Sequence, residues 1–148
     1  MADWAGAVGA MRARFKDAFN AAPVAYQNED PPQDPWPPAA PAAPWIYFEV
    51  IQAQTALRGV GLPGNQTWLT VGHIFIHTYV PTGSGLADHL ALAGKAGDVF
   101  RAATFYNAEP GAKVVCYGPS VQGGDSSSDD GNWFGVTVAI PFEFYFIA

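Results

Sequence analysis

The C-terminal segment, residues 133–147, restricts the possible folds of this sequence more than any other feature. Its residues alternate, and successive side chains of a β-strand point to opposite faces, so the segment predicts a long strand with one buried face. The apolar set expected on that face is Phe134, Val136, Val138, Ile140, Phe142, Phe144 and Phe146. Pro141 interrupts the run of backbone donors, which predicts a sheet edge or a bulge at that point.

Five further segments with clear periodicity precede this strand. Residues 1–20 place Trp4, Val8, Met11, Phe15 and Phe19 at helical spacing. Alternation predicts strands over 45–57, 67–80 and 113–117. A second helix is predicted over 85–104, with Ser84 as its N-cap, His89 on its exposed side, and a buried stripe of Leu86, Leu90, Ala93, Gly97 and Phe100. The order predicts an α+β fold: a mostly antiparallel four-stranded sheet with two helices packed on one face.

Residues 23–44 form a proline-rich segment between the first helix and the first strand. Proline fixes φ and lacks a backbone donor, so an extended arm is expected, with neither a helix nor a central strand. Tyr26 and Trp36 are large aromatic residues that usually find a surface to lie on. They favour an ordered arm, packed on this subunit or on a neighbour, over a disordered linker.

Length and composition limit the function classes. With 148 residues, the chain is expected to form a single domain over 1–148. Only 14% of the residues are charged, well below the roughly 25% of an average domain, which suggests that part of the surface is covered by permanent contacts. The net charge of −6 has the wrong sign for gripping phosphates. No apolar run is long enough to predict a membrane span, and no signal peptide is indicated at the N-terminus.

Several candidate metal and catalytic sites are considered and rejected from spacing. His73 and His77 are four apart in a strand, about 13 Å, so they cannot meet at one metal ion. The run after Asp125 lacks the glycine and the glutamate that a calcium loop requires at its sixth and twelfth positions. Ser126–Ser128 lack the sharp turn of a serine nucleophile. Cys116 is interpreted as an inert core residue. No catalytic residue, metal ligand or cofactor site is predicted.

Three segments together resemble the tail terminator proteins of long-tailed bacteriophages and related gene transfer agents, the lambda gpU type. The shared order includes a strand that leads into P-x-G-x-G, here Pro81, Gly83 and Gly85, followed by a helix with small residues ending at Phe100 and Arg101. A glycine-rich acidic loop then precedes an aromatic last strand that starts at Trp133. The resemblance covers most of the chain and rests on the order and spacing of these segments.

The resemblance implies a structural virion protein without enzymatic activity. It implies a homohexameric ring at the head-proximal end of the tail, assembled in the bacterial cytoplasm. The ring would end growth of the tail tube and join it to the neck. The implied partners are further copies of this chain, the tail tube protein, a neck or head-completion protein, and DNA passing through the lumen without sequence-specific binding. The residues expected at interfaces or in the lumen are Trp36, Trp45, Tyr47, Asp125, Asp129 and Asp130.

Other functional classes remain open from the sequence. The chain could be another neck or tail component, such as a head-completion or tail-tube protein. A small hydrolase without a known motif and a calcium-dependent binding module are the remaining alternatives.

Overall fold

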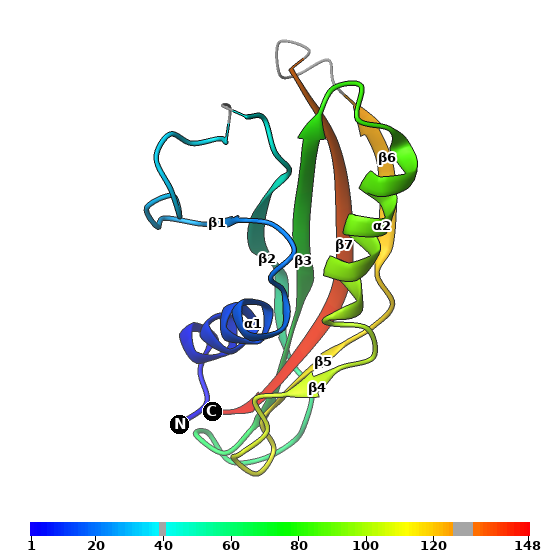
Figure 1. Ribbon diagram of the computed structural model, residues 1–148. Helices are drawn as coiled ribbons and strands as arrows, with labels where there is room; N and C mark the ends of the chain where they lie inside the picture. The colour runs from blue at the N-terminus through cyan, green and yellow to red at the C-terminus, as the bar shows by residue number, and fades with distance from the viewer. Residues whose placement is uncertain (39–40, 126–131) are drawn as a thin grey trace.

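The computed structural model describes residues 1–38, 41–125 and 132–148. Within these residues the chain forms two helices and seven strands (Figure 1). In chain order they are α1 (Trp4–Ala18), β1 (Val24–Tyr26), β2 (Trp45–Leu57), β3 (Thr67–Pro81), α2 (Leu86–Asp98), β4 (Thr104–Phe105), β5 (Lys113–Cys116), β6 (Ser120–Asp125) and β7 (Trp133–Ile147).

The seven strands form one mixed sheet that curls like half of a barrel (Figure 1). The strand order is β1-β2-β3-β7-β5-β4, and β6 also pairs with β7. β1 runs parallel to β2, whereas the other pairs are antiparallel. The predicted four-stranded, mostly antiparallel sheet is therefore wrong.

Three short strands account for the error. β1 has three residues and adds to the edge of β2 at the start of the proline-rich arm. β4 has two residues, and its first, Thr104, is the last residue of the range predicted as the second helix, which ends at Asp98 instead. β6, with the sequence SVQGGD, contains two glycines and reads as a loop. Short strands are stabilised by their neighbours in the sheet, so their own residues carry little signal.

The long C-terminal strand has the buried face that its alternation predicts. Five of its residues on that face are at most 2% exposed: Val136, Val138, Ile140, Phe142 and Phe144. They belong to one core with Met11 and Phe15 of α1 and with Ala93 and Ala96 of α2. Both helices therefore cover the same concave face of the sheet. Phe15 of α1 also stacks on Phe100 at 6.1 Å between ring centroids, which joins the two helical regions.

α2 buries Ala93 and Gly97 of its predicted stripe, and Phe100 just after the helix is buried too, but the prediction is wrong for Leu86 and Leu90. Its buried residues are His89, Ala93, Ala96 and Gly97, whereas Leu86 and Leu90 are exposed. A Cβ on Gly97 would lie 2.9 Å from the Pro119 side chain, so the helix packs on its smallest residues. This close approach turns the small side of the helix inward, and the leucines therefore face outward. Ser84 is not the N-cap either: the cap residue is Gly85.

Pro141 is at neither a sheet edge nor a bulge of the β3–β7 ladder, since it pairs opposite His73 inside the sheet. Its position coincides with a change of neighbour on the other side of β7. Residues 142–145 pair with β5, and 135–139 pair with β6. The missing N–H of the proline thus lies where β7 passes from one short neighbour to the other.

Candidate assembly site

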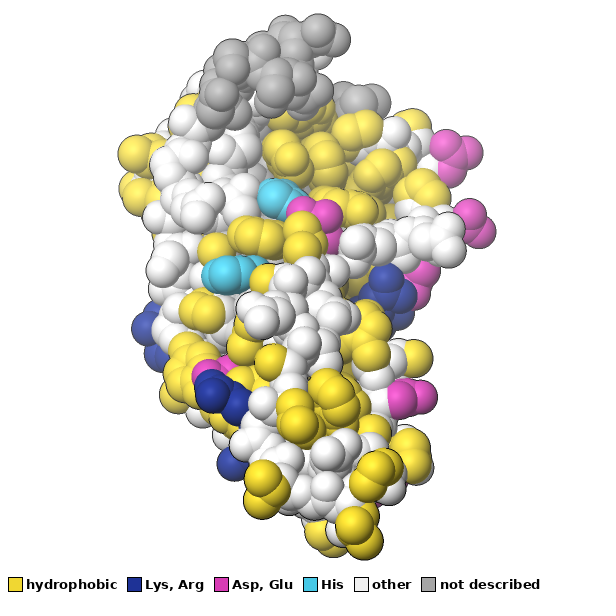
Figure 2. Space-filling model, turned by 180° about the vertical axis from the view of Figure 1, so that it is seen from behind, with side chains coloured by type: hydrophobic (Ala, Val, Ile, Leu, Met, Phe, Trp, Pro, Cys, Tyr) yellow, Lys and Arg dark blue, Asp and Glu magenta, His cyan; other side chains and the backbone are white. Residues whose placement is uncertain are grey.

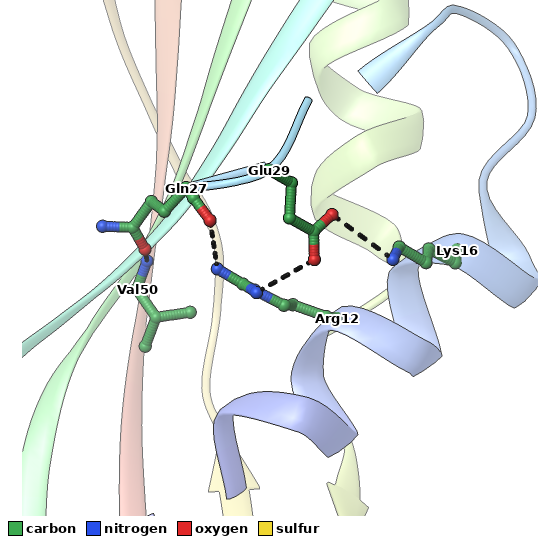
Figure 3. A network of polar contacts seen from close by, with 5 residues as sticks. All are labelled: Arg12, Lys16, Gln27, Glu29 and Val50. Carbon is green, nitrogen blue, oxygen red and sulfur yellow. Dashed lines mark hydrogen bonds and ion pairs between the residues drawn. The ribbon is translucent and has the colours of Figure 1, made fainter. Parts of the chain in front are cut away.

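The arm is attached to its own subunit by a polar network beside β1 (Figure 3). Arg12 of α1 forms an ion pair with Glu29 at 3.2 Å and donates to the backbone oxygen of Gln27 at 2.9 Å. Lys16 reaches the second oxygen of Glu29 at 3.6 Å. The side-chain oxygen of Gln27 accepts a 3.0 Å hydrogen bond from the N–H of Val50 in β2. Helix, arm and sheet are therefore held together at one point.

A cluster of aromatic side chains fixes the far end of the arm. Trp36 contacts Trp45 edge-on at 5.4 Å, and Trp45 stacks on Tyr79 at 4.2 Å. Trp133 completes the cluster at 5.9 Å from Trp45. Trp36 and Trp45 are thus brought together as half-buried residues. The indole N–H of Trp45 is buried and has no hydrogen-bond partner among the described residues.

Tyr47 lies apart from this cluster, on the convex face of the sheet. Its ring stacks on His77 at 6.1 Å, and Phe75 stacks between His77 and His73 at 6.1 and 5.5 Å. His77 also contacts Glu49 at 2.7 Å. Figure 2 shows that much of this side of the molecule is uncharged, with histidine side chains among apolar ones. The two histidines are separated by an aromatic ring, as the strand spacing predicts.

The acidic residues proposed for the lumen are only partly described. Asp125 is the last residue of β6, and its backbone pairs opposite Gly135. Asp129 and Asp130 lie outside the described residues, as do Ser126–Ser128. Of this acidic set the structure describes only the backbone of Asp125, so its placement in the lumen stays a prediction.

A groove of about 510 Å³ lies between the arm and α2. Ser84, Asp88 and His89 all line it, which makes it the place to look for a catalytic triad. His89 is fully buried, which corrects the predicted exposed position, and its Nε2 lies 2.9 Å from both oxygens of Thr78. The Ser84 hydroxyl donates to the carbonyl oxygen of Pro81. The Ser84 hydroxyl and His89 Nε2 are thus each engaged elsewhere, and His89 Nδ1 is buried without a hydrogen-bond partner among the described residues, so this groove shows no activated serine.

Metal and thiol chemistry find no support in the part of the chain that the structure describes. No cluster of three or more histidine, cysteine, aspartate or glutamate side chains is found there. Cys116 is buried, and this burial raises the pKa of its thiol to about 12, as expected for an inert core residue. None of the described helices has the length and apolarity needed to cross a bilayer.

Comparisons with known proteins give information about the fold only. No protein-family model matches the sequence, and no curated protein matches it. One solved structure superposes with a TM-score of 0.60 at 20% sequence identity, over 94% of this chain and 96% of that chain. That structure has no descriptive name, and at this identity the likeness is one of fold.

Proposed function

We propose that this chain is a tail terminator protein of a long-tailed bacteriophage or a gene transfer agent. In this role, copies of the chain form a hexameric ring at the head-proximal end of the tail tube. The ring stops growth of the tube and joins it to the neck. The proposal places the protein in the virion, with the tail tube protein and a neck protein as partners.

The position of the P-x-G-x-G segment is the observation that carries the proposal. In the described structure this segment connects the end of β3 to the start of α2. Gly83 and Gly85 both have positive φ, +89° and +99°, a conformation that side chains disfavour. The glycines that the resemblance depends on are therefore required by the backbone at this connection. A match at residues needed for geometry supports the resemblance better than a match at interchangeable positions.

The charge and chemistry of the described surface agree with a structural role. The low fraction of charged residues suits a subunit with large permanent contacts. The groove that brings Ser84, Asp88 and His89 together lacks the hydrogen bonds of a catalytic site. The tail-tube alternative differs in assembly, because a tube protein forms long polymers whereas a terminator forms closed rings.

Electron microscopy of the purified chain, alone and with polymerising tail tube protein, tests this function. We expect closed rings of the chain alone, and tubes that stop growing at one end when the chain is added. The Phe142→Asp variant, expected to be unfolded, is the negative control. Long polymers of the chain alone would favour the tail-tube alternative, and tubes that grow unchanged would contradict the proposal.

A further inference from the structure

Besides its end strands β1 and β4, the sheet has two longer strands with an open edge, or border, β2 and β6. β1 covers β2 only opposite Ile46, Tyr47 and Phe48, so the remainder of β2 has no neighbour on that side among the described residues. β6 pairs with β7 on one side and with no described strand on the other. An unpaired strand edge presents N–H and C=O groups that can pair with another chain.

The β2 border begins where the Gln27 side chain ends the pairing. The N–H of Val50 points away from β3 and is taken by Gln27 (Figure 3). The backbone N–H of Gln52, two residues further along β2, points the same way, and no side chain among the described residues accepts a hydrogen bond from it. A bulge lies between Gln52 and Gln54. Beyond it the N–H of Arg58 bonds to Thr67 of β3, so the N–H of Leu57 points outward.

The β2 border also lacks two of the features that usually protect an edge strand, charged residues and proline. Residues 51–55 are exposed although they belong to a paired strand. No charged residue or proline occurs from Val50 to Leu57, and these are the residues that natural edges use to block pairing. The bulge at Ala53 is the one protective feature present. It leaves the outward groups of Leu57 and Thr55 available.

Exposed apolar side chains collect along the same two borders. Of nine large hydrophobic side chains exposed in the described residues, eight lie on or next to them. Four belong to β2 and the loop that follows it, namely Ile51, Leu57, Val60 and Leu62. The other four belong to α2, which lies beside β6 (Figure 1), and to β6 and its lead-in, namely Leu86, Leu90, Tyr117 and Val121.

The strand directions make the two borders complementary. From β2 through β3 and β7 to β6, each neighbour is antiparallel, so β6 runs opposite to β2. A second copy rotated about an axis along the strands presents its β6 beside β2 and continues the antiparallel alternation. Such a contact uses different surfaces on the two copies, and it closes into a ring when the rotation closes.

The size of the contact is consistent with a stable assembly. A standard interface takes about 800 Å² from each partner, which is about a tenth of the 8027 Å² surface of this chain. Strand addition alone involves too few residues for that area. The four apolar side chains on each border supply further contact. The open part of β2, from Val50 to Leu57, carries no charge and β6 carries none before Asp125, so no like charges oppose each other along these segments.

We infer that copies of this chain join by strand addition, with the free edge of β2 from one copy pairing with the free edge of β6 from the next. The inference rests on the ring-forming function proposed above, and it names the surfaces that close the ring. Each copy then contributes a β2 border to one neighbour and a β6 border to the other.

The test uses one charged variant for each border. Ala53→Lys places a charge on the β2 border, and Val121→Lys places one on the β6 border. Gln33→Lys, on an exposed arm residue, is the matched control for the added charge. We expect each border variant to raise the concentration for half-assembly at least tenfold in native mass spectrometry, while the control assembles like the unchanged chain. Circular dichroism and thermal unfolding check that all three variants are folded.

Mixing the two border variants gives the sharper result. Each keeps one working border of the opposite kind, so an equimolar mixture should form a heterodimer and no ring. Leu57→Pro, which removes an outward N–H without touching the β3 ladder, should also weaken assembly. The inference is overturned if rings form normally with all three border variants, or if the unchanged chain stays monomeric at every concentration. Rings that respond as expected but fail to stop tube growth would instead overturn the proposed function.

Discussion

Replacing Gly72 by alanine should destabilise the protein through a single backbone contact. Gly72 lies in β3 opposite Gln52, next to the β2 bulge. A Cβ at this position would lie 2.2 Å from the carbonyl oxygen of Ile51 and 3.0 Å from the ring of Phe142. The oxygen belongs to the backbone of a paired strand, so relief requires the two strands to separate by about an ångström.

The magnitude follows from this geometry. Overpacking costs about 1–3 kcal/mol, and the upper end applies because a backbone oxygen cannot rotate away. Alanine reduces the conformational freedom of the unfolded chain, which returns about 0.4–1 kcal/mol. We expect a net loss of about 2–2.5 kcal/mol, which for a chain of this length lowers Tm by roughly 4–10 °C.

Chemical denaturation and thermal unfolding, followed by circular dichroism, measure this loss. The matched control is Gly94→Ala, because a Cβ there meets nothing within 4 Å and the residue lies inside α2. Alanine is favoured over glycine in a helix by about 1 kcal/mol, so the control should gain stability. The reasoning is refuted if the free energy of unfolding of Gly72→Ala lies within about 0.5 kcal/mol of that of the unchanged chain.

Three further predictions concern the core, pH and metal. Phe142→Asp should leave the chain unfolded in circular dichroism, because it buries an unpaired charge at a position 1% exposed. Burial lowers the pKa of His89. Its stabilising contribution is therefore complete above the unfolded pKa of about 6.5 and is lost as pH falls toward the lowered folded value, by at most about 1.4 kcal/mol per pH unit. His89→Gln should remove this pH dependence from the denaturation free energy. The triple change of Asp125, Asp129 and Asp130 to Asn should shift stability by less than about 0.5 kcal/mol, with or without chelator.

Each of these has a result that contradicts it. A cooperative thermal transition for Phe142→Asp would mean that the β7 face is not a packed core. An unchanged pH profile for His89→Gln would assign the acid sensitivity to other groups. A loss of several kcal/mol in the triple variant, matched by chelator in the unchanged chain, would indicate a bound cation and favour the calcium-dependent alternative.

The main features of the fold follow from periodicity. The two helices, the long strands and the buried face of β7 are set by apolar side chains that repeat over many residues, and such patterns can be read without a structure. The short strands cannot be read this way, since β4 has two residues and β1 has three. For α2 the burial predicted for Ala93 and Gly97 is confirmed, whereas that of Leu86 and Leu90 is wrong. Close contact of Gly97 with Pro119 and Val138 turns the small residues inward and leaves the leucines outside.

The candidate site was less predictable than the fold. The Trp36–Trp45 contact is consistent with the expected ordered arm, yet nothing in the sequence indicates that Trp133 joins them. The open borders were missed because they depend on which strands lack neighbours, a property of the whole sheet. The absence of charge from Val50 to Leu57 is the one local signal that could have indicated them.

The proline in β7 separates the hydrogen bonds of two short strands, and we expect these strands to open independently. β7 pairs with β5 through the residues after Pro141 and with β6 through the residues before it. The amide hydrogens of the two short strands are therefore protected by separate sets of hydrogen bonds. β6 can therefore open and exchange with solvent while β5 stays paired. In an assembled ring the exchange of β6 amides would report on a subunit boundary, and the exchange of β5 amides would report on the stability of the subunit itself.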